Sequence, residues 1–247
     1  MNRFPIGILN SKLLNEPSIK GSQLPPGTEK LSELTMQKMR SRAKAHFPSV
    51  LLTLISIIQA LALELMWSKI VESDFLWTWG FPAFIGWGMI GVSFLGILQI
   101  WIMYSTMVMG FVWQPLLRDS IIPFIIGIQE FLLITLISEQ FLTLWLYVLG
   151  SLFVIANWVS HNSLRRARLD PENAAFFGKV EPATLKDFGP AIGIVSSLVL
   201  FGIIIDLTGN QSWIPLGAIA FVNIALLMQI AASQRLWRNI IGSEDDG

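Results

Sequence analysis

Six long apolar runs, separated by short polar segments, dominate the pattern of this chain. A helix needs about 20 predominantly apolar residues to cross the hydrocarbon core of a bilayer, with a usual range of about 17 to 25. The runs that meet this requirement are residues 50–68, 84–112, 121–137, 141–160, 189–206 and 213–233. We therefore predict an all-α fold, a polytopic integral membrane helix bundle with six transmembrane helices.

The composition agrees with a membrane protein and excludes several kinds of site. The 247 residues are 53% hydrophobic and 14% charged, whereas soluble domains carry about 25% charged residues. Cysteine is absent, which excludes disulfides, thiolate catalysis and metal sites built on Cys. The formal net charge is zero, so no basic face predicts nucleic acid as a partner.

The positive charges predict the orientation of the bundle. Apart from Lys69, every Lys and Arg falls before the first apolar run, after the last, or in every second connection between them. Because short cytoplasmic loops retain Lys and Arg, this alternation predicts that both termini are cytoplasmic. The lipid bilayer is then the first partner, and a bacterial inner (plasma) membrane is the location we expect.

The segment before the first span predicts a separate membrane-surface element. We expect residues 1–27 to be a flexible cytoplasmic segment and 28–47 a basic amphipathic helix, followed by the transmembrane domain at 48–235 and a tail at 236–247. A cytoplasmic loop at 161–188 interrupts that domain, with a helix start expected at Asp170-Pro171 and another at Glu181-Pro182. The basic side chains of the surface helix are Lys38, Arg40, Arg42 and Lys44. They either bind anionic lipid headgroups or only enforce the topology.

Glu130 is the residue whose presence most needs an explanation. It lies midway along the third run, follows Gln129, and has no Lys or Arg at a similar depth in any run. A carboxyl there costs roughly 2.5 to 3.5 kcal/mol on insertion scales, and desolvation favours its protonated form. Such a group suits a proton acceptor or a cation ligand. The alternative is a protonated Glu130 that only holds helices together, through Gln99, Asn157 or Asn223.

Three further acids, Glu64, Glu139 and Asp206, lie near the outer ends of their runs. Glu130 would lie roughly 13 Å below Glu139 at a helical rise of about 1.5 Å per residue. Together the four predict a funnel that leads a cation or proton from an acidic mouth to a deep acceptor. In the alternative, the rim carboxylates simply reach water.

Small residues recur at four-residue spacing at the start of the fifth run, at Gly189, Gly193 and Ser197. This spacing lets helices approach closely, so it predicts a packing face toward another helix, a second copy of the chain or a membrane partner.

Three classes of function remain. The first is a cation or proton pathway, transporter-like or channel-like, that uses Glu130 with Gln129, Gln99 and the rim acids. The second is a non-catalytic membrane subunit or assembly protein. The third is an intramembrane enzyme that acts on a lipid-like substrate through a carboxyl general acid. The sequence contains no Gly-rich phosphate loop, HExxH or GxSxG motif, so we expect no cofactor and no metal, and we assign no catalytic residue.

Overall fold

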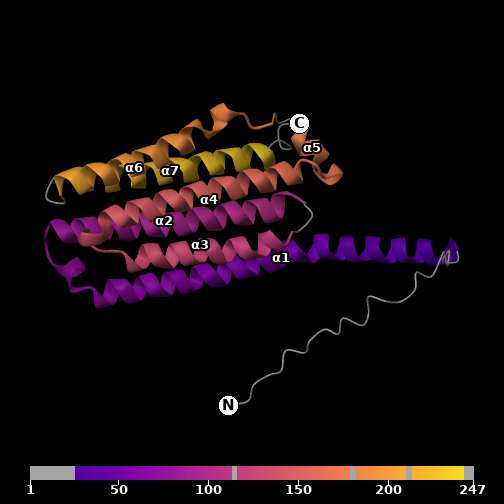
Figure 1. Cartoon of the computed structure of the whole chain (residues 1–247), viewed down its shortest axis with the longest axis horizontal. Coiled ribbons are helices and arrows are strands. Elements are labelled where there is room, and N and C mark those ends of the chain that lie inside the picture. Colours follow the sequence, from indigo (N-terminus) through magenta and orange to yellow (C-terminus); the bar gives the residue numbers. More distant parts are fainter. Residues whose placement is uncertain (1–25, 113–115, 179–181, 210–212, 242–247) are drawn as a thin grey trace, which may run out of the picture. The chain divides into compact units, whose positions relative to one another are not determined.

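A computed structural model describes residues 26–112, 116–178, 182–209 and 213–241, and all regular elements within these ranges are helical (Figure 1). The predicted all-α fold is confirmed for these residues. The chain divides into two units, Met1–Ser41 and Arg42–Gly247, and the second contains the helix bundle.

Helix α1 is a single helix, Pro26–Glu72, that includes both the expected surface helix and the first apolar run. Pro48 lies inside it, where the missing N–H leaves one bond of the helix ladder unmade. Within the second unit the buried side chains of α1 recur every three or four residues, at Leu51, Ile55, Ile58, Ala62 and Met66. This spacing defines the stripe of α1 that faces the bundle.

The next helices follow the apolar runs closely. They are the short helix η2 (Asp74–Trp77), α2 (Phe81–Gly110), α3 (Leu117–Thr135), η3 (Glu139–Phe141) and α4 (Leu142–Ala167). Gly80 precedes α2, and a proline occupies its first turn, which is a favourable helix start. Only a few residues separate α3 from α4, and the two pack together as a tight hairpin.

The connection between α4 and the fifth run contains three short helices, η4 (Pro171–Asn173), α5 (Ala174–Phe177) and η5 (Leu185–Phe188). The Asp170 carboxylate caps η4 by accepting the Glu172 backbone N–H at 3.2 Å. The helix start predicted at Asp170 is therefore confirmed, whereas Glu181 lies outside the described residues. Two long helices complete the chain, α6 (Gly189–Thr208) and α7 (Ile214–Ile241).

Packed helix pairs build the second unit: α4 is antiparallel to α3 and α6, whereas α2 and α7 run in the same direction. Helix α4 packs on α6 and α3, and α2 packs on α7, around fully buried side chains that include Met89, Trp145 and Leu198. Figure 1 shows the short connections η2 and η3 at one end of the bundle and the start of α3 and the end of α4 at the other.

Five helices are long and apolar enough to cross a membrane: α1 from Glu33 onward, α2, α4, α6 and α7. The third expected span, α3, is not among them, because its 19 residues include Arg118, Asp119 and Glu130. The structure thus supports an integral membrane protein with five such helices in the part of the chain that it describes.

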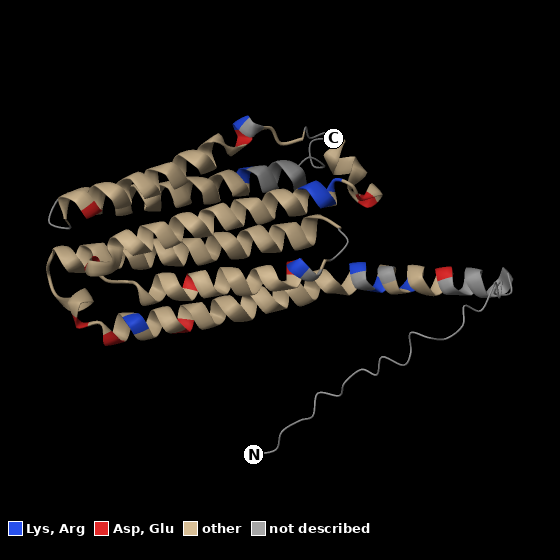
Figure 2. Ribbon diagram, in the orientation of Figure 1, with Lys and Arg blue, Asp and Glu red and all other residues tan. Residues whose placement is uncertain are grey.

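Most charged residues of the bundle lie near its two ends, with Asp and Glu at both ends and most Lys and Arg at one (Figure 2). Basic residues lie at the start of α3, in the last turn of α4 and near the start of α6, whereas Lys69 lies in the last turn of α1, at the opposite end. Acidic residues Asp74 and Glu139 begin η2 and η3 at the end that contains Lys69.

Candidate functional site

Glu130 is enclosed between helices in the interior of the bundle. Its side chain is 2% exposed, and neither carboxyl oxygen has a hydrogen-bond partner among the described residues. One turn earlier, Gly127 lies so close to α1 that a Cβ there would come within 2.4 Å of Ile58 Cγ2. The close approach of α1 and α3 explains why Glu130 is shielded from solvent.

Gln59 of α1 is the polar neighbour of Glu130. It is 4% exposed, lies close to the Glu130 side chain, and donates from Nε2 to the Ile97 carbonyl of α2 at 3.1 Å. Its Oε1 accepts no hydrogen bond from a described residue. A protonated carboxyl would supply the donor that this oxygen lacks, whereas an ionised one would not. The unpartnered oxygens of Glu130 and Gln59 are therefore the buried polar groups of this helix contact.

The three side chains expected to hold Glu130 have other partners. Their hydrogen bonds join Gln99 Nε2 to Ser233 Oγ at 3.3 Å, Asn157 Nδ2 to the Phe153 carbonyl at 2.8 Å, and Asn223 Nδ2 to the Gly88 carbonyl at 3.4 Å. Gln129 also has a different role from its neighbour, since it donates to Ser151 Oγ at 2.7 Å and links α3 to α4.

The structure does not gather the rim acids around Glu130. Glu64 and Asp206 are exposed on α1 and α6, and Glu139 is half-buried in η3. Asp206 accepts a hydrogen bond from Tyr147 Oη at 3.4 Å. Within the described residues, no group of three His, Asp or Glu side chains is arranged to hold a metal ion.

The small residues of α6 lie on an open face of the described bundle. Gly189 and Gly193 are exposed, no atom lies within 4 Å of where their Cβ would be, and Ser197 is half-buried. On α6, close packing within the chain occurs instead at Gly202, where a Cβ would come within 2.5 Å of Tyr147 Cε1 on α4. Spacing alone could not distinguish these positions.

One of the four expected headgroup residues is engaged inside the protein. Lys44 Nζ pairs with Asp170 at 2.6 Å and with Glu172 at 3.2 Å. The hydrogen bond from Lys44 holds the pKa of the Asp170 carboxyl below its usual value. Lys38 and Arg42 are exposed, and the side chain of Arg40 lies outside the described residues.

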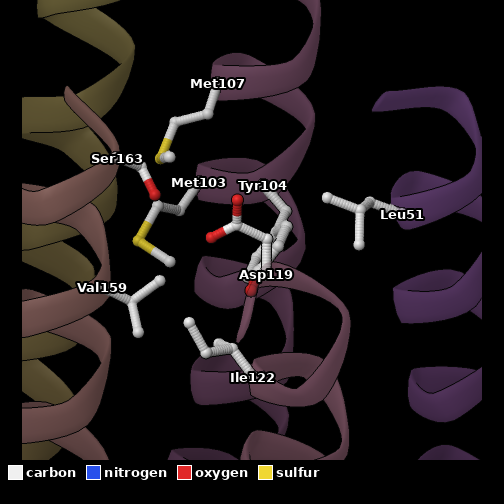
Figure 3. Close-up of a pocket in the computed structure, with 8 residues that line it drawn as sticks. All are labelled: Leu51, Met103, Tyr104, Met107, Asp119, Ile122, Val159 and Ser163. Atoms are coloured by element: carbon white, nitrogen blue, oxygen red, sulfur yellow. The ribbon is translucent and has the colours of Figure 1, made fainter. Parts of the chain in front are cut away.

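A second buried ion pair closes the basic end of the bundle. Arg166 of α4 donates to Asp119 of α3 through two nitrogens, at 2.6 and 2.7 Å, and the Leu116 N–H donates to the same carboxylate at 2.9 Å. Figure 3 shows Asp119 beside a cavity of about 10 Å³ that α1, α2, α3 and α4 line. Such a cavity is at the lower limit for one water molecule.

A much larger cavity lies between α2, α4 and α7 and has a volume of about 1420 Å³. Its walls are mostly apolar and include Ile100, Leu149, Phe153 and Leu226. Segments of the connection between α4 and α6, among them Phe177 and residues 182–184, line its other end. Neither Glu130 nor any of the rim acids lines this cavity.

Polar groups occupy two levels of the large cavity. His161, Arg165 and Arg168 line it at the basic end, and Gln99 and Gln229 line it farther inside. The Oε1 atoms of both glutamines lack a hydrogen-bond partner among the described residues.

Sequence reasoning missed this cavity together with Gln59, Gln229 and the Asp119–Arg166 pair. One signal was available, because single glutamines interrupt the apolar runs of α1, α2 and α7. An amide placed in hydrocarbon requires a hydrogen-bond partner on another helix or a ligand.

No protein-family model, curated protein or solved structure matches this chain.

Proposed function

We propose that this protein is a transporter-like membrane protein that binds a small molecule in the cavity between α2, α4 and α7. The observation that carries this proposal is the size and position of the cavity. Its volume of about 1420 Å³ exceeds the range of about 300 to 1,000 Å³ that is usual for small-molecule sites. Along α4 it extends from Leu149 to Arg165, roughly 24 Å of helix, most of the hydrocarbon thickness of a bilayer.

The same proposal includes six crossings, with both termini in the cytoplasm of a cell whose plasma membrane contains the protein. Helix α3 supports the sixth crossing, since it packs along α4 and α2 and joins the two ends of the bundle. The basic residues at one end support the orientation, because cytoplasmic loops retain Lys and Arg. The location included in this proposal is a bacterial inner membrane.

Filling the cavity tests the proposal directly. Ala156 lines the cavity on α4, so Ala156→Trp should block it, whereas Ala231→Trp places the same ring on an exposed position of α7 outside the lining. The probe is the neutral fluorophore N-phenyl-1-naphthylamine, titrated into purified protein in phosphatidylcholine nanodiscs. We expect binding that Ala156→Trp weakens at least about tenfold and Ala231→Trp leaves unchanged. Equal binding by both folded variants would overturn the proposal.

Glu130 supports a second candidate function, the cation or proton pathway. The observation that favours it is a carboxyl with 2% exposure and no hydrogen-bond partner among the described residues. Glu130→Gln should abolish proton or cation flux into vesicles, while Glu172→Gln, on an exposed position of η4 outside the candidate pathway, should retain it. Wild-type flux from a folded Glu130→Gln protein would end this candidate.

The remaining alternatives receive less support from the geometry. An enzyme with a carboxyl general acid would need a free acid at the cavity wall. Asp187 is the acid among the described lining residues, and its Oδ2 already accepts the Thr184 N–H at 2.6 Å and the Thr184 hydroxyl at 2.9 Å. For an assembly subunit, the exposed face at Gly189 and Gly193 is where we would expect a second copy or a membrane partner to pack.

A further inference from the structure

We infer that the molecule bound in the large cavity is an amphiphile with an anionic headgroup at the basic end and an apolar tail between α2, α4 and α7. This inference rests on the proposed function and names the class of ligand for the same cavity. Three observations carry it: the charge at the basic end of the cavity, which we call the mouth, the chemistry of the walls, and the position of the mouth along the bundle.

The mouth carries an excess of positive charge. Arg165 is exposed and makes no ion pair with a described residue, and His161 and Arg168 line the same end. Asp187, the acid among the described residues that line this end, keeps its negative charge because the Thr184 N–H and hydroxyl donate to it, but the two arginines outnumber it. A guanidinium binds carboxylate or phosphate oxygens through paired, charge-assisted hydrogen bonds, so this end favours an anion.

Arg168 is held in place before any ligand binds. Its guanidinium carbon lies 4.8 Å from the centre of the Phe177 ring, and its Nη1 donates to the Phe177 carbonyl at 3.5 Å. A cation fixed at the mouth in this way loses less conformational freedom when an anion arrives. The short helix α5, which contains Phe177, therefore contributes to the headgroup site.

The walls beyond the mouth suit a hydrocarbon chain. Leu149, Leu152, Phe153 and Leu226 line the inner part, and the polar side chains among them, Gln99 and Gln229, are uncharged. Amides add hydrogen bonding but do not select between ligands of opposite charge. Charge selection therefore belongs to the mouth, and burial of the tail supplies affinity in proportion to its apolar area.

The position of the mouth agrees with an amphiphile. His161, Arg165 and Arg168 lie at the inner end of α4, where the apolar run has ended and the chain enters the connection to α6. In the proposed orientation this is the headgroup level of the cytoplasmic leaflet, where anionic lipids are concentrated. A ligand with its head at this level leaves its tail at the depth of the acyl chains.

Competition with matched amphiphiles tests the inference. Full-length protein in phosphatidylcholine nanodiscs would be loaded with N-phenyl-1-naphthylamine, which would then be displaced by dodecyl phosphate or by dodecyltrimethylammonium. The two competitors share the same tail and differ in the sign of the headgroup. We expect dodecyl phosphate to displace the probe at a concentration at least about tenfold lower.

Two variants assign the preference to the mouth. Arg165→Gln should remove most of the preference for dodecyl phosphate while the neutral probe still binds. Arg235→Gln is the matched control, because Arg235 is exposed on α7 outside the cavity lining, and it should keep the preference. Equal displacement by both competitors, with the probe still bound, would overturn the anionic ligand and leave the binding cavity intact. Absence of probe binding to the wild-type protein would instead overturn the proposed function.

A last comparison identifies the source of the ligand. Nanodiscs that contain phosphatidylglycerol present an anionic amphiphile as part of the bilayer. If phosphatidylglycerol competes with dodecyl phosphate, the inference is supported and the ligand is a membrane lipid. If dodecyl phosphate binds equally in both kinds of nanodisc, the inference is supported and the ligand is a free amphiphile.

Discussion

Two acids at the basic end of the bundle show how single residues hold it together. Asp119 is 6% exposed, and the guanidinium of Arg166 balances its charge through two hydrogen bonds. Asp170 is 8% exposed and pairs with Lys44. Each pair connects two helical segments that are far apart in the sequence, α3 with α4 and α1 with the loop beyond α4.

Removing one member of the Asp119–Arg166 pair should destabilise the protein more than removing both. Asp119→Leu leaves a guanidinium without its partner, and Arg166→Met leaves a buried carboxylate, so each should cost about 3 kcal/mol. The double variant should cost less than either single one. Thermal unfolding of the purified protein in detergent measures the three values, and additive losses would contradict the prediction.

The Asp170–Lys44 pair predicts a pH dependence with a definite sign. Because Lys44 lowers the pKa of Asp170 in the folded state, the pair's contribution is fully present above the ordinary Asp pKa of about 3.9. That contribution disappears as the pH falls through the lowered pKa. The stability difference between wild type and Asp170→Asn should therefore stay nearly constant between about pH 6 and 5 and shrink as the pH falls below about 4.

Glu172 supplies the control for this measurement. It contacts the same Lys44 at 3.2 Å, but its side chain is 63% exposed, so Glu172→Gln should change stability by less than about 1 kcal/mol. A constant difference between wild type and Asp170→Asn across the acidic range would contradict the assignment.

Unusual residues could be identified from the sequence more readily than the residues that they contact. Glu130 stands out as a charge within an apolar run, but its burial depends on how α1 packs against α3. Its neighbour Gln59 could not be identified, because the contact depends on how α1 and α3 are rotated against each other. Lys44 was expected at the lipid surface for the same reason, since its partners Asp170 and Glu172 lie far along the chain.

At the scale of elements, the apolar runs predicted the helices well but not always their ends. Helix α2 matches its run within a few residues, since hydropathy and a proline in the first turn define the same start. Helix α4 continues to Ala167, past the end of its run, because polar residues extend a helix outside the hydrocarbon without losing backbone hydrogen bonds. Which helices pair is a tertiary property that a single run does not contain.

Glycines on two helices should respond in opposite ways to the same substitution. Gly127→Ala would place a methyl within 2.4 Å of Ile58 Cγ2, so α1 and α3 must separate, at a cost of about 1 to 3 kcal/mol. Gly193→Ala meets no atom within 4 Å, and the higher helix propensity of alanine should leave stability unchanged or raise it by up to about 1 kcal/mol. Thermal unfolding of both variants in detergent provides the comparison. Equal destabilisation by the two would show that the exposed face of α6 is packed in the native protein.

At the scale of the whole molecule, the bundle separates two kinds of chemistry. Glu130 and Gln59 lie where α1 meets α3, whereas the large cavity lies between α2, α4 and α7. The two proposed functions, a proton pathway and ligand binding, would therefore use separate regions of the bundle. A variant in one region should leave the other function measurable.

The absence of cysteine makes the topology directly testable, because any introduced cysteine is unique. With six crossings, Ser73→Cys and Gln140→Cys lie outside the cell and Thr184→Cys lies inside. A membrane-impermeant maleimide should label the first two in intact cells and the third only after permeabilisation. Protection of Gln140→Cys while Ser73→Cys is labelled would show that α3 does not cross.

Helix α3 also has a consequence for how the protein is made. Glu130 lies well inside α3, where a charge adds roughly 2.5 to 3.5 kcal/mol to insertion from the translocon, whereas Arg118 and Asp119 lie in its first turn. The compensating contacts come from helix α4, which is synthesised later and supplies Arg166 to Asp119 and Ser151 to Gln129. In the proposed six-span topology, insertion of α3 should therefore wait until α4 has emerged from the ribosome, so that the two helices enter the bilayer together as a hairpin.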